Sequence, residues 1–213
     1  MAIESRDNPF RPEFFDRVDA SEDELFYAVP RLVAHIDDQA RTNLGAHYAE
    51  VLTPATAILD LMSSCISHLP AEVAFAAVTG LGMNAVELDA NPQLTERVVH
   101  NLNREPRLPF ADAAFDACLI AVSIQYLTQP VAVLADVGRV LKPAGKCIVS
   151  FSNRMFPTKA VAVWRAIGDR DHAGLIAAYF DAAGGFAEPT FAALRSPTGM
   201  SDPLYVVTAR RKA

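Results

Sequence analysis

Apolar positions along this chain change their spacing near residue 55, and the change separates two regions. From Thr56 onward, short apolar runs that suit strands alternate with stretches that suit helices. The expected strands cover residues 57–61, 75–81, 98–100, 117–123, 146–151, 191–194 and 204–209. The expected helices cover a stretch after the first strand and residues 131–141, 158–167 and 172–183. This alternation predicts a doubly wound α/β sheet with helices on both faces and an antiparallel pair at one edge.

The first 54 residues are expected to form an arm and a helical cap, ahead of an α/β domain over residues 55–213. Ser21 with Glu24 fits a capping box, which predicts a short helix that stops before Pro30. Pro30 suits the first turn of a second helix that runs to about Val51. One face of this helix would be apolar, with Val33, Ile36, Ala40, Leu44 and Val51, and another would be polar, with Arg31, His35, Asp38 and Thr42.

Composition narrows the class of protein. The chain has 213 residues, of which 51% are hydrophobic and 21% charged, which is typical of one globular domain. Its net charge of -6, with no basic block except residues 210–212, predicts no nucleic-acid partner. The polar first residues predict no signal peptide, and no apolar run is long enough to predict a membrane span. The three widely spaced cysteines predict neither a disulfide framework nor a metal site, so we expect a cytoplasmic protein.

Two segments resemble class I S-adenosylmethionine-dependent methyltransferases of the type 11 kind. Residues 108–117, LPFADAAFDA, look like the LPF-x-D-x-x-FD segment before the fourth strand of that family. Residues 139–145, RVLKPAG, look like the RVLKPGG turn before its fifth strand. The resemblance covers about residues 55–210. It implies a Rossmann-like seven-stranded sheet of order 3-2-1-4-5-7-6 with an N-terminal helical extension, S-adenosylmethionine as cofactor, and methyl transfer.

The loop after the first strand departs from the pattern of that family. Relatives follow the acid of this strand with a G-x-G-x-G loop, whose glycines allow positive φ and close approach of the backbone to the cofactor. Here Asp60 is followed by Met62, Ser64 and Ile66 at the three glycine positions, and no glycine occurs before Gly80. The serines of this loop are expected to donate to the cofactor carboxylate at the start of a following helix.

The next two strands also depart from the pattern. Gly82 stands where relatives have the acid that binds the ribose hydroxyls, and Glu87 or Asp89 replaces it only if the second strand ends later. After the third strand, Asn101 stands where an acid usually contacts the adenine amino group, and its amide oxygen can accept that hydrogen bond without a charge. Two lost contacts to charged groups, at about 1.5–3 kcal/mol each, amount to several hundredfold in affinity.

The candidate site lies where the strand order reverses, outside the carboxyl ends of the first and fourth strands. The expected cofactor-binding residues are Asp60, Met62, Ser63, Ser64, Gly82, Met83, Asn84, Asn101, Leu102 and Ser123. The expected substrate-binding residues are Tyr27, Arg31, His35, Gln125, Tyr126, Asn153 and Arg154. No side chain stands out as a general base, so no catalytic residue is assigned.

Two interpretations follow from this pattern. In the first, the chain transfers a methyl group from S-adenosylmethionine to a small-molecule substrate, with groups such as Ser63, Ser64 and Asn84 compensating for the missing glycines and acid. In the second, the same fold binds another ligand or a protein partner, without catalysis or with a different reaction. The altered loop favours the second interpretation, and the matching scaffold favours the first.

Overall fold

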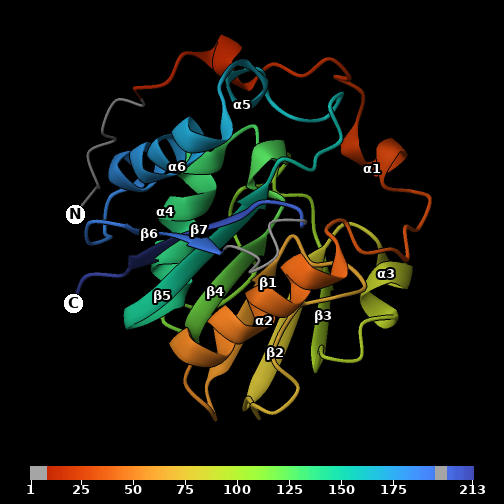
Figure 1. Cartoon of the computed structure of the whole chain (residues 1–213). Coiled ribbons are helices and arrows are strands. Elements are labelled where there is room, and N and C mark those ends of the chain that lie inside the picture. Colours follow the sequence, from red (N-terminus) through yellow and green to blue (C-terminus); the bar gives the residue numbers. More distant parts are fainter. Residues whose placement is uncertain (1–8, 195–200) are drawn as a thin grey trace.

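The computed structural model describes residues 9–194 and 201–213, and these form one seven-stranded sheet (Figure 1). The sheet order is β3-β2-β1-β4-β5-β7-β6, as the resemblance implied. Strands β1 to β5 run parallel to their neighbours in the sheet, and β7 pairs antiparallel with both β5 and β6. The strands are β1 (Ala57–Leu61), β2 (Ala77–Gly82), β3 (Glu96–Val99), β4 (Phe115–Ala121), β5 (Leu141–Ser152), β6 (Thr190–Leu194) and β7 (Leu204–Arg210).

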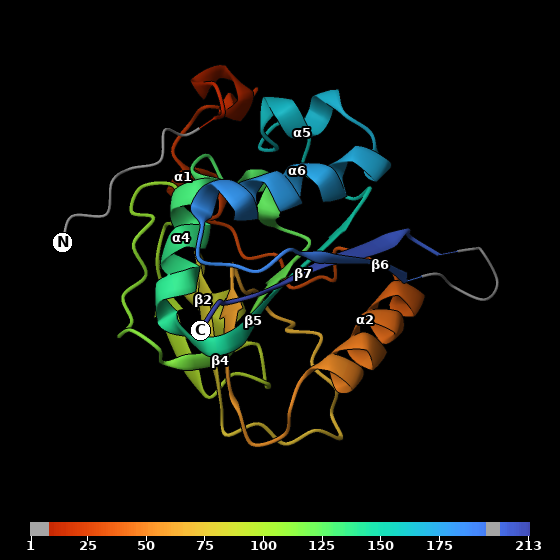
Figure 2. The same ribbon diagram turned by 90° about the vertical axis from the view of Figure 1, so that its left-hand side faces the viewer.

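Helices cover both faces of the sheet, with α4 and α6 on one side and α2 on the other (Figure 2). The helices are α1 (Asp23–Phe26), α2 (Asp38–Val51), α3 (Ala85–Asp89), α4 (Pro130–Val140), α5 (Ala162–Ala166) and α6 (Asp169–Ala183), with short 3-10 turns at Pro12–Phe15 and Ile124–Tyr126. In the part of the chain that the structure describes, no helix is both long and apolar enough to cross a membrane.

The core has two parts, one under each helical layer. Along β1, Ile58 packs with the α2 side, whereas Leu59 and Leu61 pack with the α4 and α6 side. This alternation follows from the period of two in a strand, and every residue of β1 from Ile58 onward is buried because both faces are covered. The central strands therefore hold their carboxyl ends at fixed positions.

The predicted helix from Pro30 to Val51 is only partly right. The helix begins at Asp38, where the side chain of Asp37 accepts a hydrogen bond from Ala40 N at 2.8 Å. Residues 30–37 are irregular, and Val33 is 60% exposed instead of belonging to the apolar stripe. The proposed polar face of Arg31, His35, Asp38 and Thr42 is therefore not a helix face.

The capping box at Ser21 is also wrong. Helix α1 begins at Asp23 and carries no side-chain cap, while the hydroxyl of Ser21 donates to Asp19 Oδ1 at 2.5 Å. The division into a cap over residues 1–54 and an α/β domain over 55–213 stays a prediction.

The structure has no helix after β1, contrary to expectation, and it has α3, which was not predicted. Residues 62–76 form turns whose polar groups bond within the loop and to its neighbours, which is the usual alternative to a helix in serine-rich segments. Helix α3 begins after Asn84, whose side chain accepts from Val86 N and Glu87 N. The turn expected at residues 142–145 lies inside β5, where Ala144 has a φ of 63° and the register with β4 shifts.

Candidate functional site

A cavity of about 270 Å³ lies at the carboxyl ends of β1, β2 and β4, where the strand order reverses. This is the place where open α/β sheets bind ligands. The irregular segment between α1 and α2 runs across it, so the cavity has walls from both the sheet and the N-terminal part of the chain (Figure 1).

Most of the predicted residues line this cavity. Asn84 is the only expected cofactor-binding residue outside its wall, and Gln125 and Asn153 are the only such substrate-binding residues. The predicted residues in the wall are Asp60, Met62, Ser63, Ser64, Gly82, Met83, Asn101, Leu102, Ser123, Tyr27, Arg31, His35, Tyr126 and Arg154. The sequence analysis therefore located the site, although it reached three of these residues, Tyr27, Arg31 and His35, through a helix that is not there.

The loop after β1 has the backbone conformation of a glycine loop without glycine. Met62 has a φ of 59°, in the left-handed region that glycine favours. The next residue, Ser63, donates its backbone N–H to Leu81 O at 2.8 Å, which holds the loop against β2. A Cβ on Gly82 would collide with the carbonyl oxygen of Ser63, so glycine at position 82 is required by this close packing.

Asp60 is the buried acid at the end of β1. Its Oδ2 accepts hydrogen bonds from the hydroxyls of Ser63 and Ser67, both at 2.6 Å. Burial raises the pKa of Asp60 to about 6, and these two hydrogen bonds oppose the rise. Because the loop serines already bond to Asp60, and Ser64 to Glu87, their hydroxyl protons are committed within the chain.

Glu87 is a cavity residue that the sequence analysis considered only for a longer second strand. Strand β2 ends at Gly82 as expected, yet the first turn of α3 brings Glu87 back to the cavity, where it is buried. One oxygen of Glu87 accepts from Arg31 N at 2.7 Å and the other from the Ser64 hydroxyl at 2.7 Å. The pattern Asn84-x-x-Glu87 is a capping-box signal for α3 and could have placed this acid.

Asn84 and Asn101 tie the N-terminal segment to the sheet. The side-chain nitrogen of Asn84 donates to Tyr27 O at 2.8 Å, and that of Asn101 donates to Glu24 Oε1 at 2.9 Å. The amide oxygen of Asn101 accepts from the backbone N–H groups of Asn103 and Arg104 at 2.9 and 3.3 Å. Both lone pairs of that oxygen are thus used within the chain.

Gln125 and Asn153 lie away from the cavity for different reasons. Gln125 is buried beneath it and donates to Val122 O at 2.9 Å. Asn153 is exposed and accepts from the Ser152 hydroxyl at 3.3 Å. Arg154 does line the cavity, but it pairs with Asp202 at 2.8 Å.

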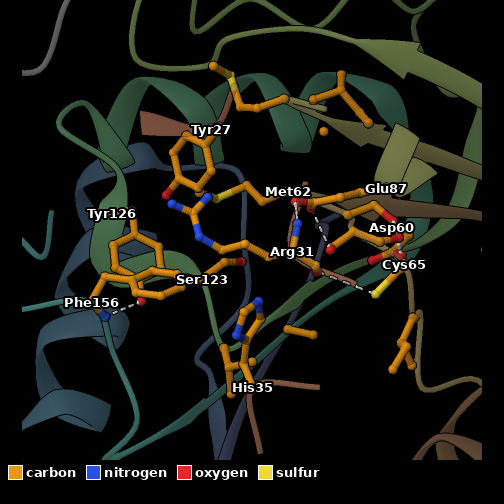
Figure 3. A pocket seen from close by; sticks show the side chains of 18 of the residues that line it. Tyr27, Arg31, His35, Asp60, Met62, Cys65, Glu87, Ser123, Tyr126 and Phe156 are labelled. Carbon is orange, nitrogen blue, oxygen red and sulfur yellow. Dashed lines mark hydrogen bonds between the residues drawn. The ribbon is translucent and has the colours of Figure 1, made fainter. Parts of the chain in front are cut away.

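The end of the cavity near β4 and β5 is aromatic (Figure 3). Tyr126 and Phe156 lie with ring centroids 5.9 Å apart, and His35 packs edge-on against Phe156 at 5.4 Å. The Tyr126 hydroxyl accepts from Phe156 N at 2.8 Å and so fixes the loop after β5. Burial raises the pKa of Tyr27, so its hydroxyl stays protonated at neutral pH. Phe156 was not predicted, because no periodic pattern marks a loop residue.

Ser123 carries an unsatisfied polar atom in this wall. Its hydroxyl is buried and has no hydrogen-bond partner among the described residues. Buried polar atoms are nearly always bonded, so an orphan that faces a cavity indicates the position of a ligand group. Ser123 follows β4 and Asp60 ends β1, and these two strands are neighbours in the sheet.

Comparison with known proteins agrees with the geometry. Residues 63–149 match the family model described as the methyltransferase domain. The (4+2)-cyclase SpnF has the same fold, with a TM-score of 0.59, 16% identity and 82% of each chain covered. An S-adenosylmethionine-dependent methyltransferase from Thermotoga maritima gives 0.59 and 17%, over 82% of this chain and 89% of that one. One from Aquifex aeolicus gives 0.56 and 15%, over 82% and 94%. No curated protein matches the sequence.

Proposed function

We propose that this chain, which has the class I S-adenosylmethionine-dependent methyltransferase fold and matches the methyltransferase domain over residues 63–149, methylates a small molecule. The domain match indicates S-adenosylmethionine as the cofactor. When bound, that cofactor supplies an electrophilic methyl group on a sulfonium, and the acceptor provides the attacking electron pair.

The observation that carries the proposal is the cavity itself. It lies at the reversal point of the sheet, it contains the orphaned hydroxyl of Ser123 beside the strand that carries Asp60, and its volume of about 270 Å³ suits a small ligand. The segment between α1 and α2 covers it, which favours a small acceptor over a macromolecular one.

The residues present fit the cofactor, with a different set of contacts from the family pattern. Glu87 supplies the acid for the ribose hydroxyls, because each of its oxygens accepts only one bond and a carboxylate offers about four sites. Asp60 and Ser123 hold the cofactor's amino group, and the apolar wall at Leu81, Met83 and Leu102 takes the adenine. Catalysis then rests on positioning and on exclusion of water by the N-terminal segment.

Labelled cofactor tests this function and the class of acceptor together. The protein is incubated with methyl-labelled S-adenosylmethionine and a cell extract that has been divided by size. We expect label in the small-molecule fraction and its loss in Glu87→Ala, while Asp89→Ala, an exposed acid of the same helix, keeps activity. Label only in the macromolecular fraction contradicts the small acceptor, and no label in any fraction contradicts methyl transfer.

A second candidate is a different reaction in the same cleft. Met62 places a side chain where relatives have glycine, and the (4+2)-cyclase SpnF shares this fold. For this candidate we expect binding of S-adenosylhomocysteine without turnover of S-adenosylmethionine, or binding of neither. Methyl transfer in the labelling experiment rules it out.

We also propose a cytoplasmic location and no nucleic-acid partner. Cys65, Cys118 and Cys147 are all unpaired, which suits a reducing compartment. The net charge of -6 provides no general attraction for phosphates.

A further inference from the structure

The guanidinium of Arg31 is held in a fixed position at the aromatic end of the cleft (Figure 3). It lies 4.4 Å from the ring centroid of Phe26, 5.3 Å from that of Phe156 and 5.8 Å from that of Tyr27. It also donates to Phe26 O at 2.9 Å. Rings on several sides restrict the side chain without neutralising it, so the charge is already in place before any ligand arrives.

Arg31 differs from the other cations around the cleft because it has no acidic partner. Within residues 9–194 and 201–213, no carboxylate lies at ion-pair distance from its guanidinium. By contrast, Arg154 pairs with Asp202 at 2.8 Å, and Arg17 pairs with Asp23 at 2.5 Å. A half-buried guanidinium with free N–H groups beside a cavity is suited to bind a carboxylate in a bidentate manner.

The charges of the cleft are separated between its two ends. Asp60 and Glu87 lie on the β1 and β2 side, where their oxygens accept hydrogen bonds from the loop serines and from Arg31 N. Arg31 and His35 lie toward Phe156, on the side of β5. An anionic group is therefore favoured at the Arg31 end and disfavoured at the other end.

The walls beside Arg31 suit an apolar, flat ligand body. Tyr27, Tyr126 and Phe156 present rings to the cavity, and Met62 and Met155 add adaptable apolar surface. We propose that the methyl acceptor is a small carboxylic acid with an aromatic or similarly flat body, and that Arg31 binds its carboxylate. This inference rests on the proposed function, because it assigns the acceptor to the same cleft.

Calorimetry with three probes of one shape tests this proposal. The probes are 4-hydroxybenzoate, 4-hydroxybenzamide and 4-hydroxybenzylamine, which are anionic, neutral and cationic at neutral pH. They are titrated into the wild type, Arg31→Gln, Arg31→Lys and Arg170→Gln, an exposed arginine of α6 that serves as control. All variants keep the backbone N–H of residue 31 that Glu87 accepts.

We expect the wild type and the control to bind the benzoate about tenfold tighter than the benzamide, since a charge-assisted hydrogen bond is lost with the amide. Arg31→Gln removes this preference, and Arg31→Lys keeps only part of it because an ammonium has no planar fork. If Arg31→Gln does not fold, the wild-type preference and its reduction in Arg31→Lys decide the matter.

Two outcomes overturn the proposal. One is equal affinity of the wild type for the benzoate and the benzamide. The other is tighter binding of the benzylamine to Arg31→Gln than to the wild type, which would make the aromatic rings a site for a cationic ligand that Arg31 fills. A parallel titration with S-adenosylhomocysteine separates this proposal from the proposed function: cofactor binding without carboxylate preference overturns only the present inference, and the reverse result overturns only the methyltransferase.

Discussion

Asp60 is an acid that is destabilised by its own position at the end of β1. Burial raises its pKa from 3.8 to about 6, so between these values the folded protein keeps a proton that the unfolded chain has released. Its contribution to stability is therefore greatest below about pH 4 and falls as the pH rises to about 6. Such a cost at a cavity wall is expected where a charged oxygen is needed for a ligand.

Asp60→Asn tests this cost. Above pH 6, the variant should be more stable than the wild type by on the order of 2 kcal/mol, because it has no buried charge. Near pH 4 the difference should disappear. The measurement is thermal unfolding at pH 4, 6 and 8, with exposed Asp181→Asn as control. A difference between wild type and Asp60→Asn that does not change with pH would show that Asp60 is not titrating in this range.

Met62 tests whether the loop after β1 carries backbone strain. Its φ of 59° is unfavourable for any side chain by about 1 kcal/mol, and glycine avoids this cost. We expect Met62→Gly to be more stable than Met62→Ala by about that amount, since both lose the same packing and only glycine relieves the strain. Urea unfolding of the two variants measures the difference. If the alanine variant is equally stable or more stable, the strain is absent.

At the level of single residues, the strand ends could be predicted from the sequence, but the use of each side chain could not. Asp60 and Ser123 follow apolar runs, so their place in the site follows from the sheet topology alone. Glu87 and Phe156 lie on a short helix and a loop, and they reach the cavity only through contacts with segments far away in the sequence. No local pattern records such contacts.

At the level of elements, the N-terminal segment depends on a buried charge cluster for its position. Asp23 is 5% exposed and contacts Arg17 at 2.5 Å, Lys159 at 3.5 Å and Asn103 at 2.7 Å. Lys159 is fully buried and also lies 3.3 Å from Asp19. Removing one partner from such a cluster leaves buried charge without compensation.

Asp23→Ala should therefore destabilise the protein by about 3 kcal/mol and loosen the segment over the cleft. Glu24→Ala, which removes a more exposed acid of the same helix, should have an effect of less than about 1 kcal/mol. Trypsin digestion under native conditions measures the loosening, because Arg17 and Arg31 both lie in this part of the chain. Equal digestion rates for the two variants would contradict the role of the cluster.

Elements with strong periodicity were predicted well, and those defined by tertiary hydrogen bonds were not. The apolar runs of β1 and β4 and the amphipathic pattern of α4 stand out in the sequence, and each element lies within a few residues of its expected place. Residues 30–37 have helical spacing, but the hydrogen bond from Arg31 N to Glu87 and the Asp37 cap hold them outside the helix. Propensity is a weak guide where the fold provides such partners.

At the level of the whole molecule, the sheet brings together an acidic end and a basic end in one cleft. Asp60 and Glu87 come from the first two βα connections, and Arg31 comes from a segment that crosses over them. The account assigns the cofactor to the acidic end and the acceptor to the basic, aromatic end. Its central claim is that Glu87 replaces the missing acid of β2, so that the cleft binds the cofactor despite the altered loop.

Calorimetric titration with S-adenosylhomocysteine tests this claim most directly. We expect one site per chain in the wild type and in Asp89→Ala, and at least about tenfold weaker binding in Glu87→Ala, because hydrogen bonds to a charged acceptor are lost. No detectable heat with the wild type at millimolar ligand, or unchanged affinity in Glu87→Ala, would contradict the account.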